Sequence, residues 1–145
     1  MKTYSTHLVV EAEHLDEGEH AGFLAQQAMA KNAHSAMREQ LGLGLMEMKE
    51  RHSLFLVMRT VGINYHSQLC LGEELDIEIT MWISRPTCLA FYCTLRRDGK
   101  VTTKMGWEMA LVNNSTKRPC TIPDWMREKV GTETPTKALQ LTRFD

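Results

Sequence analysis

The alternation of hydrophobic and polar residues predicts that the second half of the chain forms strands. Residues 75–84 place leucine, isoleucine and methionine at every second position between polar residues, the period of a half-buried strand. Residues 101–111 alternate in the same way, and the apolar runs at 54–65 and 88–95 fit two further strands. Residues 3–12 are predicted as a first strand. Five strands are therefore expected.

Residues 22–41 predict the only long helix. Helix-forming Ala, Gln, Met, Lys and Arg dominate this segment, and Ala25, Met29 and Ala33 recur at helical spacing on one face. Gly42 and Gly44 follow, as glycines do past a helix C-terminus. The alanine-rich face would let a sheet approach closely.

Turn and loop signals complete the order of elements. The polar segment 13–19 predicts a loop, Gly62 a break in the strand that contains it, and Asp98-Gly99 a tight hairpin turn. Residues 124–130 fit a short helix capped by Asp124, and the polar tail beyond Gly131 is expected to be loose.

This order of one strand, one long helix and a meander predicts an α+β fold with the helix on one face of an antiparallel sheet. The hairpins exclude a doubly wound parallel sheet, which needs crossover helices. A length of 145 residues and the lack of any linker or repeat indicate a single domain over residues 1–145.

Composition narrows the classes of function. The charges nearly balance, with 17 Lys and Arg against 18 Asp and Glu, so nothing global attracts nucleic acid or an anionic membrane. No stretch reaches the ~20 apolar residues of a membrane span, and no secretory signal is visible at the N-terminus. The four cysteines form no Cys-x-x-Cys pair and are expected to be reduced, buried thiols, which favours a cytoplasmic location.

Local motifs carry a family resemblance over about residues 5–125. His-Leu-Asp-Glu-Gly-Glu-His-Ala at 14–21 resembles the Asp-x-x-Gly-His-Val-Asn-Asn element of the 4-hydroxybenzoyl-CoA thioesterase and acyl-CoA thioesterase families. Leu-Gly-Glu-Glu-Leu at 71–75 resembles their Leu-Gly-Asp-Glu-Leu turn, and Ser84-Arg85 and Arg118-Pro119 resemble their later arginine motifs. The resemblance implies the hotdog fold, in which a curved antiparallel sheet wraps around one long central helix.

The resemblance also implies roles for the loop before the helix. Asp16 matches the family's catalytic Asp, which attacks a thioester carbonyl or activates water, and His20 matches the His that follows it. The amide of Phe23 or its neighbours would polarise the carbonyl at the helix N-terminus, and Gly22 would leave that approach open. On residue type alone, Asp16 fits a capping or solvated loop carboxylate better, and the resemblance reverses that preference. Glu19 stands in place of a family Gly, which leaves the substrate class open.

The basic residues suggest where coenzyme A would bind as part of the substrate. Arg85, and after it Lys117 and Arg118, match family positions and would hold the phosphates of coenzyme A. The cluster at 96–100 fits a solvated hairpin tip better. A nucleic-acid patch is disfavoured because the charges are mixed and no aromatic residues interleave with them.

Two functional interpretations of the histidines are weaker: a metal site in the loop, and a direct role for His34 in the reaction. A metal site would gather residues His14, Asp16, Glu17, Glu19 and His20, but these are crowded into seven positions without a helical ligand pair. His34, where the family has Arg, is expected to be structural. We therefore expect no metal ion and no other cofactor.

The sequence thus predicts a thioesterase that acts on an acyl-CoA or acyl-carrier-protein thioester. A non-catalytic hotdog protein that binds an acyl-CoA or a lipid-like ligand is the alternative, and a hotdog hydratase is a third. The exposed sheet edge predicts a homodimer or homotetramer with sites at the subunit interface.

Overall fold

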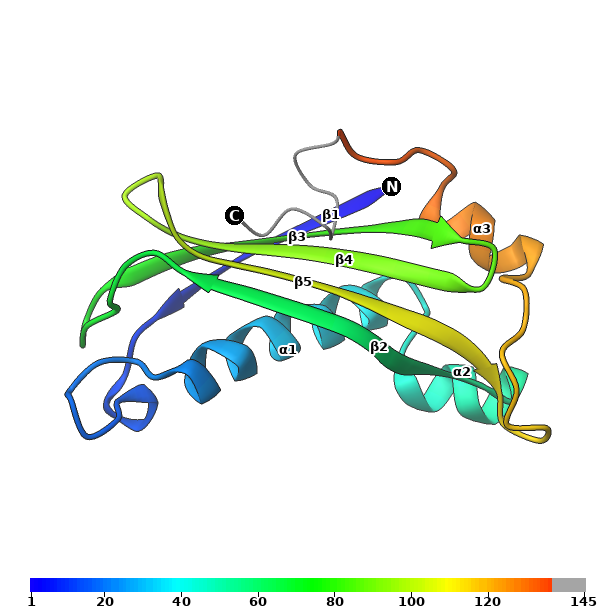
Figure 1. Cartoon of the computed structure of the whole chain (residues 1–145), viewed down its shortest axis with the longest axis horizontal. Coiled ribbons are helices and arrows are strands. Elements are labelled where there is room, and N and C mark those ends of the chain that lie inside the picture. The colour runs from blue at the N-terminus through cyan, green and yellow to red at the C-terminus, as the bar shows by residue number, and fades with distance from the viewer. Residues whose placement is uncertain (137–145) are drawn as a thin grey trace.

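The computed structural model describes residues 1–136 of the chain and contains one five-stranded sheet. The strands lie in the order β1-β3-β4-β5-β2, and every neighbouring pair is antiparallel. In Figure 1 the sheet is a curved, twisted layer along which the long helix α1 runs. The α+β prediction of an antiparallel sheet around one long helix is confirmed. The elements are β1 (Lys2–Val9), the 3-10 helix η1 (Ala12–His14), α1 (Phe23–Gln40), α2 (Leu45–His52), β2 (Leu54–Tyr65), β3 (Glu74–Arg85), β4 (Cys88–Arg97), β5 (Lys100–Asn113) and α3 (Asp124–Val130).

The main core lies between α1 and one face of the sheet. The small and flexible side chains of Met29, Ala33 and Met37 on α1 are buried, as the helical periodicity predicts. They belong to the same core cluster as Phe91 and Met81 from the central strands. Alanines on the helix allow this close approach, and the removal of so much apolar surface from water stabilises the fold.

The opposite face of the sheet carries a second, smaller cluster. Trp82, Ala90 and Tyr92 are buried there, and Met1 packs against them. The central strands are therefore covered on both faces. The half-buried pattern predicted for 75–84 is correct at the start of β3 but wrong from Ile79 to Trp82, where four successive residues are buried.

Local predictions met three corrections. Helix α2 is absent from the sequence prediction, although Gly44 precedes it as N-cap and Ser53 ends it in the left-handed region. Gly62 causes no break, because it pairs with Gly106 inside a continuous β2, whose irregularity lies instead between Met58 and Thr60. Helix α3 is confirmed, but its N-cap is Pro123 and Asp124 is already helical.

The remaining expectations concern turns, termini and cysteines. The left-handed φ angles of Asp98 and Gly99, 53° and 77°, confirm the tight hairpin turn. Of the tail predicted to be loose, residues 137–145 lie outside the described part of the chain. Cys88 and Cys93 are buried and Cys120 partly so, whereas Cys70 is exposed, contrary to expectation; all four are free thiols. Within residues 1–136, no helix is both long and apolar enough to cross a membrane.

Candidate active site

The loop before α1 folds into a tight turn around Asp16. The Asp16 N–H donates to the His20 carbonyl at 2.8 Å, and the Glu19 N–H donates to the Asp16 carbonyl at 3.1 Å. One carboxylate oxygen, Oδ1, accepts the Gly18 N–H at 2.9 Å and the His20 N–H at 3.4 Å. Glu19 has a φ of 62°, in the left-handed region where glycine is most at ease. The turn therefore explains the family's glycine at this position, and Glu19 adopts its backbone at a cost of about 1 kcal/mol.

The second carboxylate oxygen of Asp16 lies against the start of α1. Gly22 is the N-cap of this 18-residue helix, and no side chain caps it. A Cβ atom on Gly22 would lie 2.9 Å from Asp16 Oδ2, so the carboxylate fits only because this residue has no side chain. The first N–H groups of a helix lack intrahelical partners and carry a partial positive charge. A carboxylate and a set of free amide donors therefore stand side by side.

These groups open onto a pocket of about 830 Å³ between the loop, the start of α1 and the end of β2. Three of the predicted site residues, Asp16, His20 and Phe23, line it, and Phe23 is 60% exposed. Gly22, the fourth predicted site residue, does not line the pocket and lies against the Asp16 carboxylate. The other lining residues are Glu17, Gly18, Ala21, Gln26, Tyr65, His66, Ser67 and Gln68.

Sheet-like contacts fix the loop to the opposite wall. His20 forms an isolated antiparallel bridge with Cys70, and the Ala21 N–H donates to the Leu69 carbonyl at 2.7 Å. The His20 Nδ1 atom is shielded from solvent and has no hydrogen-bond partner among the described residues. The backbone of His20 is therefore held by Asp16 on one side and by Cys70 on the other, whereas the Nδ1 atom of its ring has no partner among the described residues.

Arg97 anchors the wall formed by residues 66–73. Its Nη1 donates to the Gln68 carbonyl at 2.8 Å and lies 2.6 Å from a carboxylate oxygen of Glu73. Partial desolvation acts to raise the pKa of the Glu73 carboxyl. The hydrogen bonds from the Cys70 N–H and from Arg97 outweigh it and lower this pKa below its usual value. The prediction of a solvated hairpin tip is wrong for Arg97, which binds the pocket wall.

The three predicted coenzyme A contacts, Arg85, Lys117 and Arg118, lie far from this pocket within one chain. The pocket adjoins Tyr65 at one end of β2, whereas Leu54 at the other end pairs with Asn113, whose N–H donates to the Arg118 carbonyl. The twelve residues of β2, Leu54–Tyr65, span roughly 36 Å of strand. Lys117, beside Arg118, donates to the Asn114 side chain at 2.7 Å.

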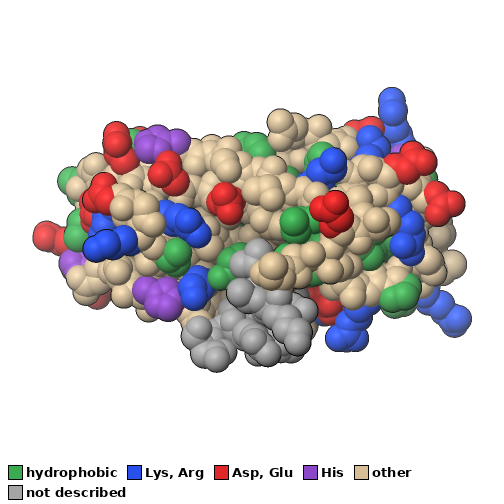
Figure 2. All heavy atoms as spheres, turned by 90° about the horizontal axis from the view of Figure 1, so that it is seen from above, with side chains coloured by type: hydrophobic (Ala, Val, Ile, Leu, Met, Phe, Trp, Pro, Cys, Tyr) green, Lys and Arg blue, Asp and Glu red, His purple; other side chains and the backbone are tan. Residues whose placement is uncertain are grey.

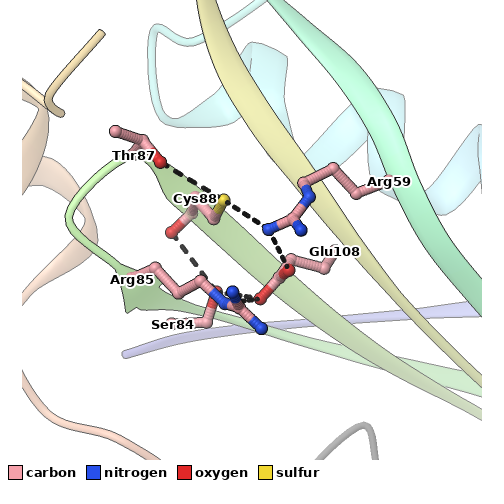
Figure 3. Close-up of polar contacts among 6 residues, drawn as sticks. All are labelled: Arg59, Ser84, Arg85, Thr87, Cys88 and Glu108. Carbon is pink, nitrogen blue, oxygen red and sulfur yellow. Dashed lines mark hydrogen bonds and ion pairs between the residues drawn. The ribbon is translucent and has the colours of Figure 1, made fainter. Parts of the chain in front are cut away.

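Arg85 belongs to a charged cluster that sequence reasoning missed (Figure 3). The Glu108 carboxylate is only 8% exposed and lies 3.4 Å from Arg85 Nε and 3.2 Å from Arg59 Nη1. It also accepts the Ser84 hydroxyl at 2.8 Å. Three strands thus share one buried carboxylate. Its only sequence signal is an acidic residue on the polar phase of β5, which does not reveal its partners. On the face of the molecule that Figure 2 shows, positively and negatively charged side chains are mixed and neither charge dominates.

His34 lies in the core and not in the pocket. Its ring meets Phe91 and Trp107 edge to face, with centroids 4.4 and 5.6 Å apart. Burial, and secondarily the charge of Arg38, lowers the pKa of His34 from 6.5 to about 3. The ring is therefore neutral at physiological pH, in agreement with the structural role expected for it.

The residues of the metal alternative do not converge. The His14 Nδ1 accepts the Glu11 N–H at 2.8 Å, a capping bond of η1. Across residues 1–136, no three His, Cys, Asp or Glu side chains are grouped so as to hold a metal ion.

Comparison with known proteins agrees with this architecture. Residues 10–130 match the model of the thioesterase-like superfamily. No protein with a curated description matches the chain.

Solved structures with the same fold include enzymes and a coenzyme A complex. A hypothetical protein from Staphylococcus aureus in complex with CoA has a TM-score of 0.82 at 18% identity, over 93% of this chain and 89% of that one. A 1,4-dihydroxy-2-naphthoyl-CoA thioesterase from Synechocystis has a TM-score of 0.81 at 11% identity, over 89% and 96%. A 12:0-ACP thioesterase from Umbellularia californica has a TM-score of 0.79 at 17% identity, over 88% of this chain and 52% of that one. The fold is therefore the hotdog fold, as the sequence predicted.

Proposed function

The chain belongs to the thioesterase-like superfamily, and from this premise we propose that it hydrolyses the thioester bond of an acyl-CoA or an acyl-carrier protein. One observation carries the proposal: the Asp16 carboxylate lies against Gly22, at the N-terminus of α1, and Asp16 and Phe23 line an open pocket. A thioester carbonyl placed there would meet an attacking group on one side and amide donors on the other.

In the proposed reaction the thioester oxygen accepts the N–H groups of Phe23 and its neighbours. The negative charge that develops on this oxygen is then stabilised by preorganised donors, each worth about 10²–10³ in rate. Asp16 either attacks the carbonyl carbon, expelling the thiolate and forming an anhydride that water then hydrolyses to the free acid, or takes a proton from a water that attacks the carbon. In the second route the thiolate leaves and is protonated, and the free acid is released directly. His20 assists by holding this water or by moving a proton.

We propose a homodimer, or a tetramer of two dimers, formed through β2. This strand is an edge of the sheet, and its side chains of Val57, Met58 and Val61 are exposed. Two β2 strands paired antiparallel about a two-fold axis place the Leu54 end of one beside the Tyr65 end of the other. Lys117 and Arg118 of one protomer, with Arg85 behind them, then approach the pocket of its partner, where they would hold the phosphates of coenzyme A.

We propose the cytoplasm as the compartment, because Cys70, Cys88, Cys93 and Cys120 are free thiols and reduced thiols are typical there. The alternative function is a binder of acyl thioesters without turnover. Glu19 in place of the family's glycine favours this alternative, because the change falls in the reacting loop.

The experiment that tests the proposal is turnover of a panel of acyl-CoA and acyl-carrier-protein thioesters by the wild-type protein. Products should be followed by mass spectrometry, since the free cysteines react with thiol reagents. We expect the release of free acid from at least one class of acyl group. Saturable binding of these ligands with no product above the buffer rate would establish the binder instead.

A further inference from the structure

A buried glutamine in the first turns of α1 connects the pocket to the sheet. Gln26 is 4% exposed and lines the pocket beside Asp16 and Phe23. Its Nε2 donates to the Ala21 carbonyl at 2.9 Å, and its Oε1 accepts the hydroxyl of Thr103, on β5, at 2.5 Å. The side-chain amide thus links the sheet to the peptide that precedes the helix.

Both hydrogen bonds are needed to bury this amide without penalty. A polar group removed from water costs about 1–3 kcal/mol unless it finds a partner. Thr103 is fully buried and donates its hydroxyl to Oε1, which leaves Nε2 to face Ala21. An apolar side chain would fill the same space in the core, so the amide has a role that packing alone does not require.

The bond to Ala21 determines the direction of an amide at the helix start. In a planar trans peptide, the carbonyl of Ala21 and the N–H of Gly22 point in opposite directions. Gln26 holds the carbonyl, while the N–H of Ala21 is already tied to the Leu69 carbonyl at 2.7 Å. The Ala21–Gly22 peptide therefore cannot rotate without the loss of the Gln26 bond.

We propose that Gln26 is a positioning residue for thioester hydrolysis, which fixes the Ala21–Gly22 peptide and hence the amide donors at the N-terminus of α1. This inference rests on the function proposed above and adds a residue to it. Gln26 acts through the backbone and contacts no reacting atom. Thr103 is its orienting partner.

The test uses four variants of the full chain. Gln26→Leu keeps the volume and removes the donor. Gln26→Glu keeps the shape but presents a second oxygen to the Ala21 carbonyl, and only its protonated form can donate there. Thr103→Val removes the hydroxyl, and Thr103→Ser is the matched control that retains it.

The decisive readout is kcat relative to wild type as a function of pH. We expect Gln26→Leu to lower kcat about 10- to 100-fold at every pH, with KM changed less than about threefold. Gln26→Glu should lose as much at pH 8 and regain at least about fivefold relative to wild type by pH 5.5, because burial favours the neutral acid. The other ionisable side chains that line the pocket are the same in both proteins, so their effects cancel in the ratio; they are Asp16, Glu17, His20, Tyr65 and His66.

A purely structural glutamine gives a different result. Its loss would lower the melting temperature while the folded fraction kept its kcat, and the ratio for Gln26→Glu would not depend on pH. An unchanged kcat in Gln26→Leu, or a pH-independent ratio in Gln26→Glu, overturns the inference about Gln26. If Asp16→Asn is inactive in the same assay, the proposed function still holds. A wild-type protein that hydrolyses no thioester overturns both. If Gln26→Leu does not fold, two other results decide: the pH-dependent recovery of Gln26→Glu, and a lower kcat in Thr103→Val than in Thr103→Ser. Equal kcat values in the two Thr103 variants would count against the inference.

Discussion

Gly22→Ala is the change that most closely probes the geometry of the site. The new Cβ would lie 2.9 Å from Asp16 Oδ2 and 3.3 Å from Asp16 Cβ, whereas ordinary contact begins at 3.4 Å. The carboxylate must therefore move by about 0.5 Å, away from the amides at the start of α1. Displacements of this order at reacting groups cost about 10- to 100-fold in rate, which corresponds to about 1.4–2.7 kcal/mol of activation free energy.

The stability of the variant should hardly change. The φ of Gly22 is −72°, which alanine adopts readily, and the lower backbone entropy of the unfolded alanine variant offsets the poorer N-cap. We expect kcat/KM to fall at least tenfold while the free energy of unfolding changes by less than about 1 kcal/mol. Gly18→Ala is the control, because its Cβ would meet Asp16 Oδ1 at an ordinary 3.4 Å, and it should lose no more than about threefold. A fully active Gly22→Ala enzyme would refute the assigned position of the carboxylate.

Three further predictions concern other parts of the molecule. Because burial, above all, lowers the pKa of His34 from 6.5 to about 3, the unfolded chain binds one more proton between these values. The free energy of unfolding should then fall by about 1.4 kcal/mol per pH unit on acidification through that window. Urea unfolding at several pH values should show a smaller dependence of this free energy on pH in His34→Leu than in wild type. The same dependence in both proteins would disprove the assignment to His34. Glu108→Gln should lower the free energy of unfolding by about 1–2 kcal/mol in the same assay, because it removes the charge of a buried carboxylate that two half-exposed arginines contact. The control Glu78→Gln changes an exposed side chain and should alter this free energy by less than about 0.5 kcal/mol. Val61→Lys on β2 should yield monomers in sedimentation and Val9→Lys on β1 should not; dimers of both variants would exclude β2 as the interface.

The strands and the long helix were predictable because their side-chain periods are local. The alternation in β5 and the alanine-rich face of α1 are visible in the sequence and locate both elements, although β5 is buried on both of its faces from Met105 to Glu108 and from Ala110 to Val112. Prediction failed where a distant segment decides burial, as at Trp82, which packs with Met1 on the outer face of the sheet. Helix α2 was missed because it has only eight residues, and the glycines before it indicate only the end of α1.

The site was predictable only as far as one short motif reaches. Asp16, His20 and Phe23 lie within eight positions, so the loop brings them into one pocket. The contact of Gln26 with Thr103 joins residues 77 positions apart, and no local pattern reveals it. The same is true of Arg97, which donates to the carbonyl of Gln68, 29 positions away in the sequence.

The catalytic role of Asp16 is tested most directly by the turnover of one active acyl thioester by Asp16→Asn. Asp124→Asn, which changes an exposed carboxylate at the start of α3, is the matched control. If Asp16 attacks the thioester or activates the attacking water, kcat falls at least about 10²-fold in Asp16→Asn and is unchanged in Asp124→Asn, while both proteins unfold at the wild-type temperature. Equal turnover by Asp16→Asn and wild type would exclude this role and assign the chemistry to another group.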